Sequence, residues 1–201
     1  MKVGYDNFCY IIYDLVQKKA GIVDPGYDIK KPLEFLTSKH LILDYVFLTH
    51  YHSDHTAGAK EIKRRFPASK VVASKQDGDQ LGIPPDVLAT DGSQVHVGAI
   101  TVDVLLTPGH TPGGICLIVE NKALLTGDTL FIGDCGRTDL PGGNLAQMFA
   151  TLHEKLMRLP DELVVYPGHD YGDKPFDTLG NQKRTNKTFL AKTLKEFSMI
   201  P

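Results

Sequence analysis

Three histidines and an aspartate lie within one short segment, as His50, His52, Asp54 and His55. An apolar run at residues 46–48 precedes them and predicts a buried strand, and a helical pattern follows them. Because side chains two apart in an extended chain point to the same side, we expect His50 and His52 to face one way. Asp54 and His55 then fall where the chain turns into the helix. Imidazole and carboxylate groups suit zinc, iron and manganese, so each pair can hold one of two neighbouring cations.

Three further residues of metal-binding type, His110, Asp128 and His169, each follow an apolar, strand-like run. A glycine stands directly before each of them, which permits a tight turn and a close approach of the backbone. A single histidine after a strand is usually a hydrogen-bonded loop residue. Three such loops beside the first segment are a much rarer coincidence, so we expect all these residues to meet at one metal site.

The remaining histidines and the cysteines have no comparable setting. Cys9 and Cys116 lie in apolar runs typical of a core, and Cys135, in a loop, is interpreted as structural or as a neighbour of the site ligands. Three cysteines at wide spacing fit a reducing compartment better than a disulfide framework. The histidines interpreted as structural are His40, His96 and His153.

The composition restricts the classes of protein that this chain can represent. With 201 residues, 42% of them hydrophobic, the chain is predicted to form one domain over residues 1–201. A net charge of −2, without a basic stripe or a polybasic tail, argues against binding to nucleic acid or to a membrane surface. We find neither a signal peptide nor an apolar run of about 18 residues, so the expectation is a soluble cytoplasmic protein.

Strand-like patterns recur along most of the chain. Alternating apolar residues predict a pair of strands in residues 95–106, whereas residues 77–90 are expected to form an irregular surface excursion. Further strands are predicted at residues 8–13, 20–23, 44–48, 71–73, 115–119, 123–125 and 163–166.

Helical patterns separate these groups of strands. Pro32 begins a short helix, and the helix after the first metal-type segment is expected to run to about Phe66. Asn144 caps a longer helix with Gln147 as its capping-box partner, and the tail from Thr178 onward is helical. Since helices alternate with strand pairs, we expect an α/β (α+β) fold in which helices cover the outer faces of sheets.

The ligand-type residues occur along the chain in the order His50, His52, Asp54, His55, His110, Asp128 and His169. This order resembles the metal signature of the metallo-β-lactamase superfamily, and the match runs through nearly the whole chain. The resemblance implies a four-layer αββα sandwich with two metal ions at one edge. It implies one cation held by His50, His52 and His110, a second held by Asp54, His55 and His169, and Asp128 as the bridge.

Two such cations imply a hydrolytic chemistry. They would lower the pKa of a bridging water toward neutrality, and the resulting hydroxide would attack a carbonyl or phosphoryl centre without a serine or cysteine nucleophile. Asp54 and Asp128 would be ligands first and would orient this water. Asp128 stands where the commonest zinc β-lactamases have a cysteine, which argues against antibiotic hydrolysis. Asp170 either orients its neighbour His169 or is an unrelated loop acid.

Two branches of the superfamily compete, and the first is hydroxyacylglutathione hydrolase (glyoxalase II), which cleaves a glutathione thioester. Residues 6–12, 23–26 and 127–131 are similar to it. The resemblance implies substrate contacts from Arg137 and Tyr171. Asp139 departs from the aromatic residue often found there, and with only residues 172–201 after Tyr171 the helical C-terminal domain of that family is not expected.

The second branch is persulfide dioxygenase, which oxidises glutathione persulfide with dioxygen. Residues 135–139 and 166–171 resemble it. It implies a single iron held by the residues His50, His110 and Asp128, a facial triad with open positions.

Residues 136–139 favour the dioxygenase without deciding between the branches, because small hydrolases of the glyoxalase type carry similar Gly-Arg-Thr/Ser-Asp sequences. We place the hydrolase first by a modest margin. Zinc is then the first choice of metal, with iron or manganese as alternatives. The partner is a small thioester or thiol-derived molecule, and a homodimer is a further expectation. A lactonase or other metallo-hydrolase, an RNA-processing enzyme and a binding protein with a degenerate site rank lower.

Overall fold

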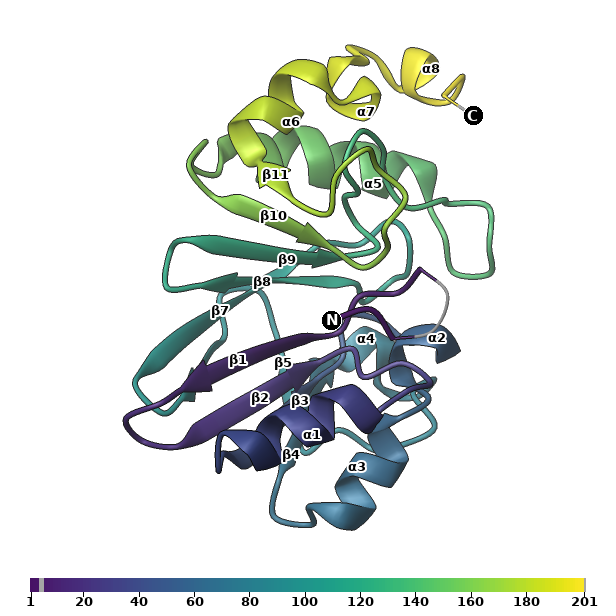
Figure 1. Ribbon diagram of the computed structural model, residues 1–201. Coiled ribbons are helices and arrows are strands. Elements are labelled where there is room, and N and C mark those ends of the chain that lie inside the picture. The colour runs from purple at the N-terminus through teal and green to yellow at the C-terminus, as the bar shows by residue number, and fades with distance from the viewer. Residues whose placement is uncertain (4–5, 201) are drawn as a thin grey trace.

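The computed structural model describes residues 1–3 and 6–200 and contains two β-sheets packed face to face, with helices on both outer sides (Figure 1). The strand order is β1-β2-β3-β4-β5 in the first sheet and β11-β10-β9-β8-β7-β6 in the second. The buried cluster between the sheets includes Phe47 and Val72 from the first and Val104 and Leu117 from the second. This arrangement is the αββα sandwich that the sequence implies.

In the first sheet, β1 and β2 form an antiparallel pair, and β2 to β5 run parallel. The strands are β1 (Tyr10–Asp14), β2 (Lys19–Val23), β3 (Ile42–Phe47), β4 (Lys70–Ser74) and β5 (Val87–Ala89). The expectation that residues 77–90 are irregular is wrong for β5. This edge strand has three residues, too few to show a periodic pattern, and its pairing with β4 makes it a strand.

In the second sheet, β6 to β9 form an antiparallel meander, β10 runs parallel to β9, and β11 pairs antiparallel with β10. On β7, Val102 and Val104 are buried between more exposed neighbours, so the alternation read from the sequence is confirmed. The strands are β6 (Gln94–Val97), β7 (Ile100–Leu106), β8 (Ile115–Val119), β9 (Ala123–Gly127), β10 (Val164–Pro167) and β11 (Asp177–Thr178).

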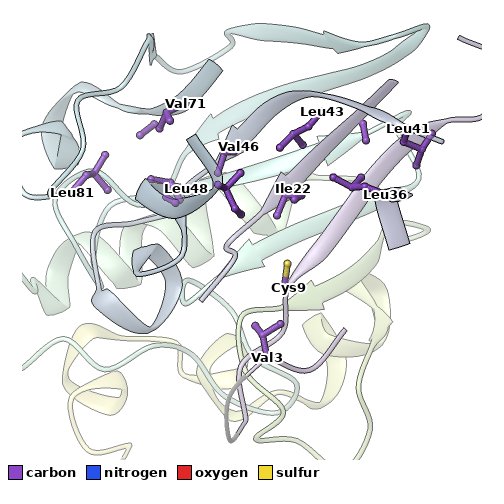
Figure 2. Close-up of a cluster of buried hydrophobic side chains, with 14 residues drawn as sticks. Val3, Cys9, Ile22, Leu36, Leu41, Leu43, Val46, Leu48, Val71 and Leu81 are labelled. Carbon is purple, nitrogen blue, oxygen red and sulfur yellow. The ribbon is translucent and has the colours of Figure 1, made fainter. Parts of the chain in front are cut away.

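Helices cover the outer face of the first sheet. Figure 2 shows the cluster beneath them, to which Leu36 of α1 and Ile22 and Val46 of the strands belong. The helix expected to run to Phe66 is divided into α2 and α3, and Gly58 between them packs so closely on Ile29 that an added Cβ would lie 2.3 Å from it. The helices are α1 (Lys30–Ser38), α2 (Ser53–Thr56), α3 (Ala59–Arg65) and α4 (Lys75–Gly78).

The second sheet is covered by the chain after Asn144. Asn144 Oδ1 accepts a hydrogen bond from Gln147 N at 3.0 Å, which confirms the cap. The reciprocal half of the predicted capping box is absent there, because Asn144 N donates to Gly109 O instead. The helix continues through a π-helical and a 3-10 turn before the helical tail. The elements are α5 (Leu145–Ala150), η1 (Thr151–Lys155), η2 (Leu156–Arg158), α6 (Leu179–Thr185), α7 (Lys187–Leu190) and α8 (Leu194–Phe197). Within the described ranges, no helix has the length and apolar character that a bilayer crossing requires.

The pairing directions bring several loops to one edge of the sandwich. β7, β9 and β10 point the same way, so the loops after them leave the second sheet at a common edge. Two backbone hydrogen bonds join this edge to the first sheet, from Ile115 N to Thr49 O at 2.9 Å and from Phe8 N to Gly168 O at 2.8 Å. The loops after β3, β7, β9 and β10 are those that carry the metal-type residues.

Candidate metal centre

The seven ligand-type residues meet at this edge. Three overlapping groups each place one ligand atom per residue within 4.8 Å of the others. Although β3 ends at Phe47, so that His50 and His52 lie in a loop and not on the strand, their rings still meet at 4.8 Å between centroids. The groups are His50, His52 and His110; His50, His55 and Asp128; and Asp54, His55 and His169.

The first group consists of three imidazoles. His110 Nε2 and His52 Nδ1 face each other at 2.9 Å. His110 Nδ1 donates to the backbone carbonyl of Arg137 at 2.7 Å, which leaves its Nε2 as a lone pair. Two nitrogen lone pairs at this distance repel each other unless a proton or a cation lies between them.

His50 completes this group through a similar relay. The Thr49 hydroxyl donates to Asp24 Oδ2 at 2.6 Å, so its oxygen accepts from His50 Nδ1 at 3.1 Å. His50 Nε2 therefore carries a lone pair, and this buried atom finds no hydrogen-bond partner among the described residues. An orphaned buried nitrogen aimed at other lone pairs fits a metal ligand.

The group formed by Asp54, His55 and His169, called the second group from here on, is oriented in the same way. His55 Nδ1 donates to Asp24 Oδ2 at 3.1 Å, and His55 Nε2 faces His169 Nε2 at 3.2 Å. Asp54 Oδ2 lies 3.4 Å from His169 Nε2 and 3.6 Å from His55 Nε2. One carboxylate oxygen and two imidazole nitrogens thus point at a common position.

Asp128 lies between the two groups. Its Oδ2 is 3.5 Å from His110 Nε2 and 3.3 Å from His169 Nε2, and its Oδ1 is 3.3 Å from His55 Nε2. Asp128 Oδ1 also has no hydrogen-bond partner in the described part of the chain. The carboxylate is therefore placed to contact cations in both groups.

The protonation equilibria of these side chains are strongly shifted. Burial lowers the pKa of His55 and of His169, but the surrounding carboxylates outweigh it and raise both pKa values to about 9. Burial raises the pKa of Asp128, yet His55 and His169 hold it well below its usual range. For His50, burial and the neighbouring imidazoles keep the pKa far below the ordinary value. The site concentrates anionic and lone-pair groups that need positive charge among them.

The glycine before each ligand residue has the role expected of it. Gly109 and Gly127 adopt positive φ angles of 146° and 48°, which other residues rarely accept. At Gly168 the reason is space, because an added Cβ would lie 2.3 Å from Asp128 Oδ1 and 2.9 Å from His55 Cε1. The backbone thus approaches the ligand groups as closely as the sequence pattern suggested.

A cavity of about 840 Å³ opens onto both groups, and both predicted substrate residues line it. Arg137 is exposed, and its Nε and Nη2 each donate to the Asp139 carboxylate at 2.7 Å. Tyr171 stacks on His169, with ring centroids 4.6 Å apart and an interplanar angle of 7°. Tyr51, which is not among the lining residues, donates its hydroxyl to the carbonyl of Pro141, next to the lining residue Leu140, at 2.6 Å.

Two orienting residues were missed by the sequence reasoning. Asp24 holds His55 and, through Thr49, His50, and Asn7 Nδ2 donates to Asp54 Oδ2 at 2.9 Å. Asp24 had a usable signal, since an acid directly follows a buried strand. Asn7 had no signal, because only the tertiary fold brings the N-terminal segment beside Asp54.

Of the two roles considered for Asp170, the orienting one finds no support, because its carboxylate forms no hydrogen bond with His169 among the described residues. Its carboxylate forms an ion pair with Lys2 instead. His169 Nδ1 is buried without a hydrogen-bond partner there.

The residues interpreted as structural lie outside the ligand groups. His153 stacks on Phe149 with ring centroids 4.2 Å apart, and its Nε2 donates to Thr188 O. Cys9 and Cys116 are fully buried. Cys135 does line the cavity, and burial raises the pKa of its thiol to about 12, which disfavours the reactive thiolate form.

Comparison with known proteins agrees with this geometry. A zinc-dependent hydrolase of Bacillus velezensis, described as probable polyketide biosynthesis hydrolase BaeB, is 31% identical and covers 96% of this chain and 86% of its own. The hydroxyacylglutathione hydrolase of Synechococcus sp. is 37% identical and covers 83% of this chain and 65% of its own. The crystal structure of ETHE1 from Myxococcus xanthus superposes with a TM-score of 0.87 at 32% identity, covering 97% of this chain and 87% of its own.

The family to which these relatives point is also the one whose sequence model matches directly. The model of the metallo-beta-lactamase superfamily matches residues 4–169, a range that contains all seven ligand-type residues. Members of this superfamily are metal-dependent enzymes, and the relatives include both hydrolases and a dioxygenase. By its sequence, its αββα sandwich and its ligand groups, this chain belongs to the metallo-β-lactamase superfamily.

Proposed function

We propose that this protein is a metal-dependent thioesterase of the glyoxalase II type, which hydrolyses a hydroxyacylglutathione or a similar thioester. The observation that carries the proposal is the second ligand group. Asp54, His55 and His169 converge as closely as the three imidazoles do, and dedicated orienting residues hold two of them. A site for one cation would need only one group. Two divalent cations, zinc first, therefore suit the donor set best.

The proposed assignment gives each side chain a task. His50, His52 and His110 hold one cation, Asp54, His55 and His169 hold the other, and Asp128 contacts both. When bound, such cations lower the pKa of coordinated water and polarise a carbonyl oxygen.

The surrounding residues complete the reaction. The carboxylates of Asp54 and Asp128 orient the attacking water, and Asp54 lies on the solvent side, where its side chain is 36% exposed. Water adds to the thioester carbonyl, the C–S bond breaks, and a carboxylate, a thiol and one proton leave. Tyr171 and Arg137 contact the substrate at the mouth of the cavity.

A second candidate is a persulfide dioxygenase with one iron. The likeness to ETHE1 from Myxococcus xanthus favours it. The geometry favours it as well, because Asp128 Oδ2 lies 3.5 Å from His110 Nε2 and 4.0 Å from His50 Nε2. These three residues would form the iron site.

Metal analysis and two assays on the same sample distinguish the candidates. The protein is expressed without added metal, its metals are determined by elemental analysis, and it is assayed anaerobically with S-D-lactoylglutathione and, with an oxygen electrode, on glutathione persulfide. Two metals per chain and thioester cleavage are expected. One iron per chain with oxygen uptake would overturn the hydrolase in favour of the dioxygenase.

A matched pair of variants tests whether activity belongs to the proposed centre. His110→Ala is expected to abolish thioester cleavage and to lower the metal content. His96→Ala, on the exposed side of β6, removes an imidazole far from the ligand groups and is expected to change neither. Undiminished activity in His110→Ala would contradict the assignment and leave a binding protein as the better description.

A further inference from the structure

One wall of the cavity is apolar, and the hydrolysis proposed above makes no use of it. Leu140, Leu145, Phe197 and Ile200 all line the same cavity as His52, Asp54 and His110. Phe197 is buried, while Leu145 and Ile200 are partly buried against the cluster to which Phe197 belongs. Leu145, Phe197 and Ile200 are thus supported by the packed cluster behind them, and these apolar wall residues come from the 140s loop, α5, α8 and the residues after α8.

This wall is anchored in the packing of the helical layer. The Phe197 ring meets Phe149 of α5 edge-on at 5.6 Å between centroids. Figure 1 shows the helical tail on the outer side of the second sheet, and residues of α8 and of the loop before α5 line the cavity. An apolar group of a substrate bound at the ligand residues would therefore reach a preformed apolar surface. Small-molecule sites are usually preformed and lined in this way.

The charges of the cavity argue against an anionic group on the apolar wall. Among its described lining residues, Arg137 is the only lysine or arginine. Its Nε and Nη2 each donate to the Asp139 carboxylate. Asp134 lines the cavity as well and pairs with Lys187 outside it at 2.8 Å. The four residues of the apolar wall therefore offer no cationic partner to the carboxylates of a thiol carrier, which leaves Arg137 as their contact in the cavity.

We propose that the apolar wall binds the acyl chain of the substrate, so that the preferred substrates are thioesters of linear, medium-length acyl groups. This preference presupposes the hydrolase activity proposed above and narrows its substrate class. Each methylene that moves from water to the wall contributes about 0.8 kcal/mol, or about fourfold in kcat/KM. The gain is expected to level off once the chain extends beyond Phe197 and Ile200.

The first experiment varies the acyl chain and the thiol separately. kcat/KM is measured for acetyl, butanoyl, hexanoyl and octanoyl thioesters of a small neutral thiol, N-acetylcysteamine, and of glutathione. A rise of about fourfold per methylene in both series is expected, because the acyl group is common to them. A rise that depends on the thiol and not on the acyl chain would assign the wall to the thiol and overturn the proposal.

A binding measurement separates this proposal from the hydrolase activity. The carboxylate products, from acetate to octanoate, are titrated into the metal-loaded protein by calorimetry, and Kd is expected to fall with chain length. If no thioester is cleaved but Kd still falls, the acyl site stands and the thioesterase fails. If thioesters are cleaved but neither Kd nor kcat/KM changes with the length of the acyl chain, the acyl site is overturned and the thioesterase activity stands.

Two variants, one after α8 and one within it, provide the control. Ile200→Ser is expected to lower the octanoyl-to-acetyl ratio of kcat/KM at least about tenfold, because it replaces part of the wall with a polar group. Leu194→Ala removes a leucine of α8 that is exposed and lies outside the cavity lining, and the ratio is expected to stay as in the parent. Equal ratios in both variants would contradict the proposal.

Discussion

Asp24 Oδ2 accepts a hydrogen bond from His55 Nδ1 at 3.1 Å, and this contact fixes which nitrogen of His55 faces the ligand cluster. The same oxygen accepts from the Thr49 hydroxyl, which in turn orients His50. One buried carboxylate from the loop after β2 therefore sets a lone pair in each of the two groups.

The substitution Asp24→Asn is expected to weaken metal binding about 10- to 100-fold. An asparagine amide cannot accept from both partners with the charge of a carboxylate, so the tautomer of His55 is no longer fixed. Competition with a chelator, starting from metal-free protein, measures the change. Asp28→Asn is the control, because Asp28 is exposed and its oxygen accepts only from Lys30 N among the described contacts. Equal metal affinities in the two variants would show that Asp24 has no orienting role.

The substitution Gly168→Ala is expected to lower the metal content and the activity at least tenfold. The new Cβ would stand 2.3 Å from Asp128 Oδ1, so either this carboxylate or the backbone beside His169 must move. Elemental analysis of the purified variant gives the metal content. Gly78→Ala, where the nearest atoms lie at an ordinary 3.5 Å, provides the comparison and should retain its metal. Full occupancy in Gly168→Ala would mean that the site tolerates the crowding.

The substitution Arg137→Ala is expected to raise KM for S-D-lactoylglutathione about fivefold, the effect of an exposed charge contact of about 1 kcal/mol. Arg137 is exposed and its only ion-pair partner in the described ranges is Asp139, so folding should change little. Steady-state kinetics and a thermal melt test the two parts. Identical KM values in variant and parent would remove Arg137 from the substrate site and leave it as a loop ion pair.

The stability of the metal-saturated protein is expected to depend on His153 at mildly acidic pH. Partial burial lowers the pKa of His153 below its ordinary value near 6.5, so the folded chain takes up this proton less readily than the unfolded chain. The contribution of His153 is therefore complete above about pH 6.5 and declines as the pH falls below it.

Denaturant titrations between about pH 8 and about pH 5.5 on the parent and on His153→Gln measure this contribution. The variant cannot take up the proton, so its free energy of unfolding should change less with pH than that of the parent. It also loses the stack on Phe149 and should be less stable at every pH. Parallel pH profiles would contradict the prediction.

The chemistry of the centre could be predicted from residue types and order. The first segment is recognisable because four ligand-type side chains lie close together in it, as His50, His52, Asp54 and His55. His110, Asp128 and His169 are recognisable because each follows an apolar run and a glycine. The alternation along β7 and the cap at Asn144 are local features as well, and both predictions are confirmed.

The remaining features depend on distant contacts, and these explain the wrong predictions. Residues 87–89 form a strand only because β4 offers a pairing edge. The helix after His55 is divided into α2 and α3, with Gly58 between them packed on the distant Ile29. Asp170 follows His169 in the sequence, but its carboxylate forms an ion pair with Lys2 near the start of the chain.

The sequence by itself determined which residues carry ligand-type side chains and in what order they occur, since residue type and spacing are local properties. The resemblance of that order to a known family implied the αββα sandwich. The tertiary structure decided which donors share a position, which nitrogen of each imidazole is free, and what surrounds the cavity. Asp24, Asn7 and the wall that ends at Ile200 reach the centre from separate parts of the chain. Their roles follow from packing and hydrogen bonding across the fold, which no local pattern encodes.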